Sequence, residues 1–436
     1  MGTCGESGNN RDMTEVTPFA TKIDDPGPRN LVVIGAGIVG ISCALHLQRD
    51  GHAVTLVDRG EPGRGTSFGN AGIIVHGASM PVGMPGMWRD IPKFLLGTEP
   101  YFSLRWSRLP RLAPWLSRLL WETRRSRVNS NAAALAILAK EVKPAWQDML
   151  DQAGANEFVL RRGWLKVYET EAAFQATAAV RELYDRHGGA YEVLNADEIR
   201  QMEPLLAPIF PRAIYFPEFD SLTNPLRVVQ TFFADFQSRG GRFLNGEVIG
   251  FELGSRPRRV RTTDGHLETD VIVLATGAWS RDLARQLGAD IPLDTERGYH
   301  FMLPSMDPGP TRPLLYGDYG FALSPMEEGI RIAHGVELAS LRAPPNYSWV
   351  SRLLPYAKRM LPDLNIEESS RWLGFRPTLP DSRPIIGASP VHSDVFLAFG
   401  HQHYGLSLGP VTGRLIADMV AGRDPGLDLA PFRAHR

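Results

Sequence analysis

Three glycines at a fixed spacing, followed by an acidic residue, are the part of this 436-residue sequence that points most directly to chemistry. Gly35, Gly37 and Gly40 form the pattern G-x-G-x-x-G, and Asp58 lies 18 residues after Gly40. Such glycines let the chain turn sharply and bring backbone N–H groups close to a pyrophosphate, while a carboxylate at this distance accepts hydrogen bonds from ribose hydroxyls. The pattern predicts a dinucleotide site, but it does not distinguish FAD from NAD.

The segments on either side of this turn have the periodicity that a dinucleotide site needs. Residues 31–34 and 53–58 are short apolar runs typical of buried parallel strands. Between them, apolar residues recur at helical spacing at Ile41, Ala44, Leu45 and Leu47. Strand, turn, helix, strand and acid therefore follow one another in the order of a Rossmann-type unit.

Two later segments could bring small polar groups to the same ligand. Residues 65–72 read GTSFGNAG, a loop of small residues with hydroxyl and amide groups, although an ordinary surface loop would have a similar composition. Residues 271–280 read VIVLATGAWS, which predicts a buried strand that ends sharply at Thr276 and Gly277. A strand ending in A-T-G is typical of the segment that closes over the dinucleotide in FAD-binding folds.

The carboxy-terminal part predicts a further strand, turn and helix. VFLAFG at 395–400 reads as a strand, HQHYG follows it, and apolar residues recur at helical spacing from Val411 to Val420. Such a unit at the far end of the chain would complete the first domain. The positive end of its helix, near residues 405–409, could stabilise negative charge on a reduced cofactor.

These motifs, in this order, make the chain similar to a known family. GAGIVG, Asp58, TSFGNAG, ATGAWS, GFRPTLPDSRPIIG and GHQHYGLSLGP resemble the FAD-dependent amine oxidoreductases related to D-amino acid oxidase, and the D-amino acid dehydrogenase-like branch most closely. The resemblance covers residues 30–425. It implies an α/β fold in which a Rossmann-type FAD-binding domain (GR2-like) carries an inserted α+β substrate domain, built on an antiparallel or mixed sheet.

The resemblance also implies which residues bind FAD. They come from the glycine turn, the end of the second strand, the small-residue loop, the A-T-G segment and the carboxy-terminal turn. The residues are Gly35, Gly37, Ile38, Val39, Gly40, Asp58, Arg59, Thr66, Ser67, Asn70, Ala71, Gly72, Val248, Thr276, Gly277, Gly400, Tyr404, Gly405, Leu406 and Ser407.

The same resemblance implies domains that are assembled from separated segments. The FAD-binding domain would comprise 30–150, 216–285 and 370–425, and the substrate-binding domain would comprise 151–215 and 286–369. The polar residues 1–29 would form a disordered extension ahead of the fold.

Four residues are expected to form the catalytic site around a carboxylate-bearing substrate. Arg376 matches the family's arginine for the substrate carboxylate, because a planar guanidinium binds a carboxylate through two hydrogen bonds. An ion pair with Asp381 is the alternative role for Arg376. Tyr299 and His300 would cover the substrate, unless they only pack within their strand. His403 would be a further substrate contact, or else a histidine bonded to nearby backbone.

We expect FAD to be bound non-covalently and no metal ion to take part. Gly69 occupies the place where relatives that attach the cofactor have a histidine, while Cys43 lies in the first helix and Cys4 in the terminal extension. His401 and His403 form an H-x-H pair without a third ligand. With only two cysteines, a disulfide framework and cysteine-rich metal centres are excluded.

Charge and hydropathy limit the partners of the protein. Lys and Arg total 47 and Asp and Glu total 48, so the chain lacks the basic excess of a nucleic-acid-binding protein. No apolar run reaches the ~20 residues that span a bilayer, and residues 1–29 lack the apolar core of a secretory signal. Residues 88–127 contain four of the nine tryptophans and nine basic against three acidic residues. They could contact a membrane surface peripherally, or be helices packed on the FAD domain.

The combined interpretation is an enzyme that transfers a hydride from Cα of a D-amino acid to flavin N5, after which the imine hydrolyses to a 2-oxo acid and ammonia. Electrons would pass to a respiratory carrier, as the resemblance implies, or to oxygen. The expected location is cytoplasmic, with a peripheral position on the inner face of the membrane as an option. The first alternative is a secondary-amine or imino-acid oxidoreductase for D-4-hydroxyproline, proline or sarcosine-like substrates. The second is a non-catalytic flavoprotein subunit.

Overall fold

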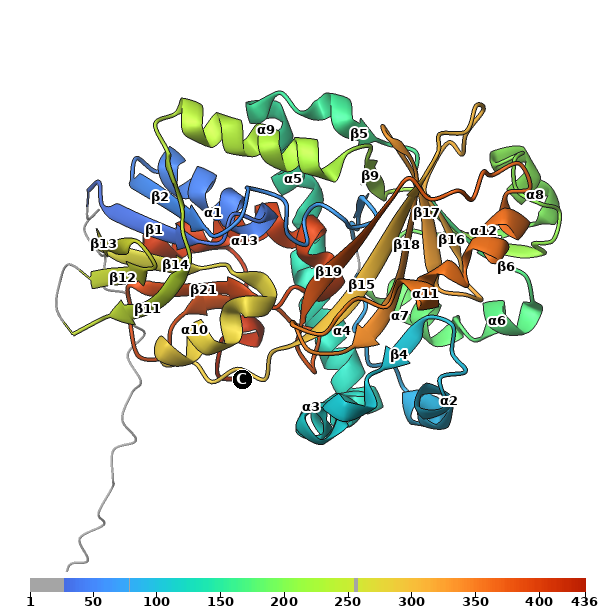
Figure 1. Ribbon diagram of the computed structural model, residues 1–436, viewed down its shortest axis with the longest axis horizontal. Helices are drawn as coiled ribbons and strands as arrows, with labels where there is room; N and C mark the ends of the chain where they lie inside the picture. The colour runs from blue at the N-terminus through green and yellow to red at the C-terminus, as the bar shows by residue number, and fades with distance from the viewer. Residues whose placement is uncertain (1–26, 78, 255–257) are drawn as a thin grey trace, which may run out of the picture.

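Two β-sheets lying side by side organise the structure (Figure 1). It is a computed structural model that describes residues 27–77, 79–254 and 258–436. Residues 1–26 of the predicted extension, with Cys4, lie outside the described residues. The α/β fold class expected from the sequence is confirmed, since one sheet is mainly parallel and the other is mainly antiparallel.

The first sheet contains the strands predicted around the glycine turn. Its strands follow the order β10-β2-β1-β14-β21-β20, and every neighbouring pair is parallel except β20 with β21. Segments far apart in the sequence therefore meet in one sheet. The strands are β1 (Asn30–Ile34), β2 (Ala53–Asp58), β10 (Arg242–Asn245), β14 (Val271–Leu274), β20 (Ile385–Ala388) and β21 (Val395–Phe399).

Both faces of this sheet are covered, which explains why its central strands are continuous apolar runs. Leu31 and Val33 of β1 belong to a core shared with several helices, and Val32 and Ile34 belong to a second core on the opposite face. Most helical residues of the first core come from α1 (Ile38–Arg49), α5 (Val142–Ala153), α9 (Pro225–Ser238) and α13 (Gly405–Val420). The second core is closed by α10 (Ser280–Gln286) and by the three-stranded sheet of β11 (Val248–Glu252), β12 (Arg258–Thr262) and β13 (Gly265–Thr269).

Close packing of two helices brings the carboxy-terminal helix to the glycine turn. A Cβ atom added at Gly409 of α13 would press on Ile38 of α1, and one added at Gly413 would overlap Ser42. Because both positions are glycine, α13 can lie directly against α1, with its first residues beside the turn that precedes α1.

The second sheet has nine strands and lies to the right in Figure 1. Eight follow the order β19-β15-β18-β17-β16-β6-β8-β7, and β4 pairs with β18 outside this path. The pairs are antiparallel except β16 with β6 and β18 with β4. The strands are β4 (Phe102–Leu104), β6 (Trp164–Tyr168), β7 (Glu192–Asn195), β8 (Arg212–Phe216), β15 (Asp294–Leu303), β16 (Leu314–Tyr316), β17 (Phe321–Met326), β18 (Gly329–Leu338) and β19 (Ser370–Thr378).

The remaining elements surround the second sheet or connect it to the first. A small sheet of β3 (Ile73–Ile74), β9 (Asp220–Leu222) and β5 (Val159–Leu160) joins the two parts. Two helices, α2 (Ile91–Leu96) and α3 (Leu109–Glu122), project from the lower side of the molecule in Figure 1. The other helices are α4 (Arg125–Lys140), α6 (Glu171–Gln175), α7 (Ala178–His187), α8 (Ala196–Met202), α11 (Tyr347–Ser351) and α12 (Leu354–Met360).

The chain crosses between the sheets at positions that differ from the predicted segment boundaries. The segment 370–425 was expected to belong wholly to the FAD domain, but its first strand, β19, pairs with β15 of the second sheet. Likewise β4 lies within 30–150 and pairs with β18. β4 has only three residues, and β19 mixes polar and apolar residues without a clear alternation, so no hydrophobic pattern in them reveals which sheet they join.

Candidate active site

A cavity of about 790 Å³ lies where the carboxyl ends of β1, β2 and β14 face the second sheet. Many predicted residues line it: Gly35, Gly37, Ile38, Val39, Asp58, Arg59, Thr66, Ser67, Asn70, Ala71, Val248, Thr276, Gly277, Tyr299, Arg376, His403, Gly405 and Leu406. Six others do not line it: Gly40, Gly72, His300, Gly400, Tyr404 and Ser407. The cavity therefore joins the predicted dinucleotide residues to the predicted carboxylate-binding arginine.

The glycine turn has no room for side chains, which fits a backbone cradle. Gly35 has a φ of +108°, and a Cβ there would overlap the carbonyl of Ala275. A Cβ at Gly40 would overlap the carbonyl of Gly35, so Gly40 supports the turn without facing the cavity. Gly37 borders the cavity, where an added Cβ would lie 3.3 Å from the hydroxyl oxygen of Ser67.

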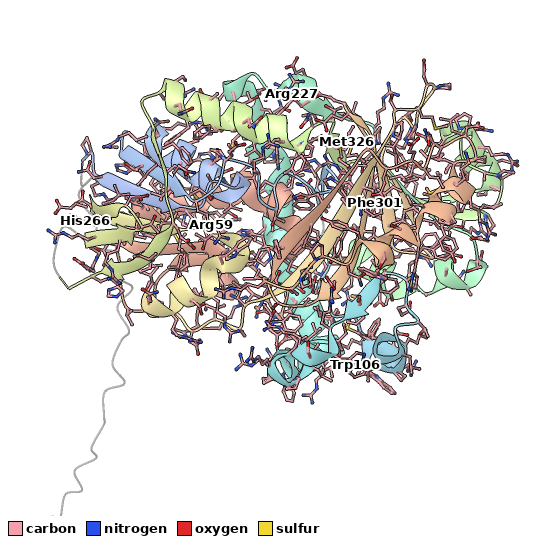
Figure 2. All side chains as sticks on the ribbon, viewed as in Figure 1. Arg59, Trp106, Arg227, His266, Phe301 and Met326 are labelled. Carbon is pink, nitrogen blue, oxygen red and sulfur yellow. The ribbon has the colours of Figure 1, made fainter. Side chains whose placement is uncertain are left out.

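The Asp58 carboxylate is fixed at the end of β2 by two backbone donors. Its Oδ2 accepts a hydrogen bond from Ala36 N (2.7 Å), and its Oδ1 accepts one from Gly60 N (2.9 Å). A carboxylate has about four acceptor positions, so Asp58 can still accept bonds from a diol. Arg59 follows it (Figure 2), and its guanidinium lies 4.6 Å from the ring centre of Trp279.

The loop at 65–72 is held in place by its own polar side chains. Ser67 Oγ accepts a hydrogen bond from Ile38 N at the start of α1 (2.9 Å), and Thr66 Oγ1 donates to the carbonyl of Phe375 on β19 (2.9 Å). Asn70 Nδ2 donates to Ser67 O, and its Oδ1 accepts from the N–H of Gly72. The predicted hydroxyl and amide groups thus order the loop between the two sheets.

The turn before α13 brings backbone rather than hydroxyl groups to the cavity. Gly405 and Leu406, the first residues of α13, line the cavity wall. The Tyr404 hydroxyl is engaged elsewhere, since it accepts from Met80 N (2.9 Å) and donates to Met80 O (3.0 Å). Ser407 Oγ accepts from Val75 N (2.9 Å). These two side chains fix the turn against the loop that follows β3.

Arg376 occupies the end of the cavity that is formed by the second sheet. Its Nη1 donates to the carbonyl of Gly335 on β18 (2.6 Å), and its guanidinium lies against Gly298. Burial lowers the pKa of Arg376, and the nearby Glu296 carboxylate acts in the opposite direction. The alternative partner, Asp381, is instead paired with Arg383 and Arg436.

His403 and His334 border the same end of the cavity as neutral side chains. His403 is exposed to the cavity, yet the protein around it lowers the pKa of the imidazole below its usual range, with Arg376 acting in the same direction. Burial lowers the pKa of His334 to about 4. Arg376 is therefore the cation available to an anionic ligand at neutral pH among the residues named at this end.

Tyr299 forms part of the wall, but its hydroxyl points into a buried ionic cluster. The hydroxyl donates to Glu337, and it accepts from Arg297 Nη2 (3.3 Å) and Asn346 N (3.0 Å). Arg297 and Glu337 are fully buried and paired (3.2 Å), and Arg105 also pairs with Glu337 (2.8 Å). Tyr299 borders the cavity, but it is only 2% exposed and its hydroxyl is already engaged.

His300 lies on the strand as expected but does not reach the cavity. Its Nδ1 bonds to the carbonyl of Gly69 (2.9 Å). Its ring stacks on the ring of Trp372, with the two ring centres 5.2 Å apart. Burial lowers its pKa to about 4. In the structure His300 therefore packs between Trp372 and the loop at 65–72.

Several residues of the cavity wall were not singled out from the sequence. Glu296 is a buried acid on β15, Gln402 takes a positive φ of 50° beside the cavity, and Trp372 lines it from β19. An acid at Glu296, within a strand whose other residues are almost all buried, is a signal that could have been noticed. Gln402 offered no such signal, because backbone strain at a non-glycine residue cannot be read from composition.

Comparisons with known proteins show which family the chain belongs to. The family described as FAD dependent oxidoreductase (DAO) matches residues 30–419. The chain belongs to this DAO family. A D-amino-acid oxidase of Bradyrhizobium diazoefficiens is 34% identical over 94% of this chain and 99% of that protein. A D-amino acid dehydrogenase of a Methylobacterium species is 30% identical over 93% of this chain and 98% of that protein.

The solved structure of glycine oxidase from Geobacillus kaustophilus shares the fold. It has a TM-score of 0.71 and 23% identity, with 94% of this chain and 99% of that chain covered. The predicted family, fold class and FAD-dependent oxidoreductase activity are thereby confirmed.

The residues present fit the FAD of a DAO-family enzyme. The backbone of the glycine turn and the fixed Asp58 carboxylate would hold the adenosine diphosphate part, since a Cβ at Gly35 or Gly40 would collide with backbone carbonyl oxygens. The loop at 65–72 and the start of α13 would border the isoalloxazine ring. FAD supplies the two-electron acceptor at this site.

Proposed function

We propose that the protein oxidises the C–N bond of a D-amino acid. The observation that carries this proposal is the position of Arg376, which lines the same cavity as the glycine turn. A guanidinium in a largely apolar cavity favours a ligand with one carboxylate. The two similar curated relatives named above, an oxidase and a dehydrogenase of D-amino acids, support this substrate class.

The side chains present can bind and orient such a substrate. Arg376 would hold the carboxylate at the end of the cavity that the second sheet forms. The start of α13 lies at the cavity, where the positive end of the helix dipole favours developing negative charge. Binding in one orientation is what allows a hydride to leave Cα toward a fixed acceptor.

The alternative substrates also carry a carboxylate, but their amine is secondary. A cyclic or N-alkylated amino acid, such as 4-hydroxyproline, proline or sarcosine, would use the same arginine. Anaerobic bleaching of the bound flavin by a panel of D-, L- and N-alkyl amino acids separates these possibilities. We expect D-amino acids to bleach it fastest. Bleaching by cyclic substrates alone would favour the imino-acid activity, and no bleaching would favour a non-catalytic flavoprotein.

We propose that FAD is held non-covalently. Position 69, where related enzymes have a flavin-linking histidine, is glycine, and a Cβ there would overlap the ring of Trp372. Cys43 is fully buried in α1, away from the cavity wall. Acid precipitation should release the yellow cofactor into the supernatant, whereas flavin fluorescence retained on a denaturing gel would overturn this point.

We also propose that residues 88–127 contact an anionic membrane surface. Six of the nine exposed large hydrophobic residues in the described chain lie here: Trp88, Leu95, Leu96, Trp106, Leu120 and Trp121. Trp106 lies at the outer edge beside α3 and α2 (Figure 2). Basic side chains lie among them, and ion pairs of Arg105 and Arg108 with Glu337 and Asp294 fix the segment to the second sheet.

No helix in the described part of the chain combines the length and hydrophobicity needed to cross a bilayer. We propose a peripheral location on the cytoplasmic face of the membrane, with electrons passed to a respiratory carrier or to oxygen. Sedimentation with anionic liposomes at low salt tests the contact. Replacing Trp88, Leu96 and Trp106 with serine should abolish it. Replacing the exposed Val193 and Val391, which lie elsewhere, should not.

A further inference from the structure

A buried carboxylate faces the carboxylate-binding arginine across two neighbouring strands. Glu296 of β15 is directly opposite Arg376 of β19 in the antiparallel register, so their side chains lie on the same face of the sheet. Both residues line the cavity, and Glu296 is only 4% exposed. A buried acid beside a substrate site calls for an explanation, because burial disfavours its charge.

The surroundings of Glu296 leave its carboxylate able to act on a ligand. Arg376 uses Nη1 to bond the Gly335 carbonyl, and Thr378 bonds to the Glu296 side chain. The charged groups that face Glu296 are Arg376 from β19 and Asp294 from its own strand. Asp294 is held by Arg108 through both carboxylate oxygens (3.1 Å each). Burial raises the pKa of Glu296 to about 7, and Arg376 opposes this rise.

We infer that Glu296 binds the α-amino group of the substrate and accepts its ammonium proton. This inference rests on the proposed function, in which Arg376 binds the α-carboxylate. Directly opposed residues in a sheet have Cβ atoms about 5 Å apart, and one carbon separates the amine from the carboxylate of an amino acid. Two adjacent groups of opposite charge on the protein therefore match two adjacent groups of opposite charge on the substrate.

The proton transfer explains why an acid, rather than an amide, occupies this position. A protonated ammonium has no free electron pair to stabilise the imine that oxidation creates. In the proposed step the N–H bond breaks, its electron pair stays on nitrogen, and an O–H bond forms on Glu296. Nothing is oxidised or reduced in this step, and the later loss of hydride is the flavin-dependent oxidation of the proposed function.

Two measurements that compare Glu296→Gln with the wild-type holoenzyme test this inference. The first is the anaerobic rate of flavin bleaching by a D-amino acid between pH 6 and 10. The wild-type kcat/KM should level off just above neutral pH. The variant should be slowed by roughly 100-fold at pH 7 and should gain about tenfold per pH unit until the free amino acid loses its own proton.

The second measurement is binding of benzoate, a carboxylate without an amine, followed by the flavin absorbance. Because Glu296→Gln removes the negative charge beside Arg376, benzoate should bind at least as tightly to the variant as to the wild type. A variant that loses benzoate and amino acid binding equally, or that keeps the wild-type pH profile, would overturn the inference. Glu296→Asp, which keeps a carboxylate, should restore most of the profile at neutral pH.

A matched control removes a buried carboxylate elsewhere. Glu203 is 1% exposed, pairs with Arg312 (3.0 Å) and does not line the cavity, so Glu203→Gln should lower thermal stability without changing the pH profile. If the wild-type flavin is not bleached by any amino acid, the proposed function fails. If it is bleached normally and Glu296→Gln behaves like Glu203→Gln, only the role of Glu296 fails.

Discussion

The guanidinium of Arg376 lies directly against the backbone of Gly298, on the neighbouring strand. A Cβ added at Gly298 would overlap the terminal nitrogen and the central carbon of that guanidinium. Gly298 is one residue before Tyr299, in the stretch where the register of β15 against β18 shifts between Arg297 and Tyr299. Because position 298 has no side chain, the Arg376 guanidinium has room to lie against the backbone of β15 at the cavity.

Replacing Gly298 with alanine should displace the Arg376 guanidinium. We expect KM for a carboxylate substrate to rise about tenfold or more while FAD remains bound, since Gly298 belongs to the second sheet and the glycine turn to the first. Steady-state kinetics and the flavin spectrum measure the two effects. Gly387→Ala is the matched control, because a Cβ at this strand position meets nothing within 4 Å. Equal effects of both variants would contradict the assignment.

Replacing Arg376 with methionine should remove the positive charge that we propose binds the substrate carboxylate. Truncating one partner of a buried charge pair costs about 2–5 kcal/mol, so kcat/KM should fall by roughly 30-fold to several thousand-fold. The absorbance change on adding benzoate should disappear, whereas the yellow colour should remain. Arg383→Met is the control, since Arg383 pairs with Asp381 and does not line the cavity. Unchanged kinetics in Arg376→Met would remove this residue from the site.

The sequence predicts the cofactor part of the site better than the substrate part. Gly35, Gly37 and Asp58 act within one strand-turn-helix-strand unit, so their positions follow from local spacing. The substrate end depends on which residues of β15 and β19 are opposite each other. The pairing of Glu296 with Arg376 joins positions 80 residues apart, and no local pattern fixes that register.

Side-chain direction is a second property that the sequence could not supply. Tyr299 was expected near the substrate and does border the cavity, but its hydroxyl is hydrogen-bonded to the ion pair formed by Arg297 and Glu337. His300 follows it and is opposite Trp372 in the register of β15 with β19, so it lies on the face of the sheet that carries Glu296 and Arg376, where it bonds to Gly69 and packs on Trp372. Adjacent strand residues point in opposite directions, so Tyr299 and His300 could not both face the substrate.

Replacing Tyr299 with phenylalanine should affect stability more than substrate binding. The change leaves a buried carboxylate, Glu337, without one of its donors, which costs about 1–3 kcal/mol. We expect a lower melting temperature and a KM within about threefold of the wild type. Thermal denaturation and steady-state kinetics measure the two quantities. A large rise in KM with unchanged stability would show instead that the hydroxyl binds the substrate carboxylate.

Buried neutral histidines should make the protein less stable as the pH falls below neutrality. Burial lowers the pKa of His300 and His334 to about 4 and that of His401 to about 3. An unfolded chain protonates each near pH 6.5, so between pH 6.5 and 4 it binds more protons than the native state. The free energy of unfolding should then fall by about 1.4 kcal/mol per pH unit for each such histidine. Glu296 acts in the opposite direction, because its raised pKa makes the native state the better proton acceptor between pH 4.5 and about 7.

Urea denaturation of the holoenzyme at a series of pH values measures this slope. His300→Asn keeps a donor for the Gly69 carbonyl but does not titrate, so the slope between pH 6.5 and 4 should become shallower by about 1.4 kcal/mol per pH unit. The control is His266→Asn, at an exposed position of β13 (Figure 2), which should leave the slope unchanged. A wild-type stability that is constant from pH 6.5 to 4.5 would mean that these imidazoles become charged without unfolding the protein.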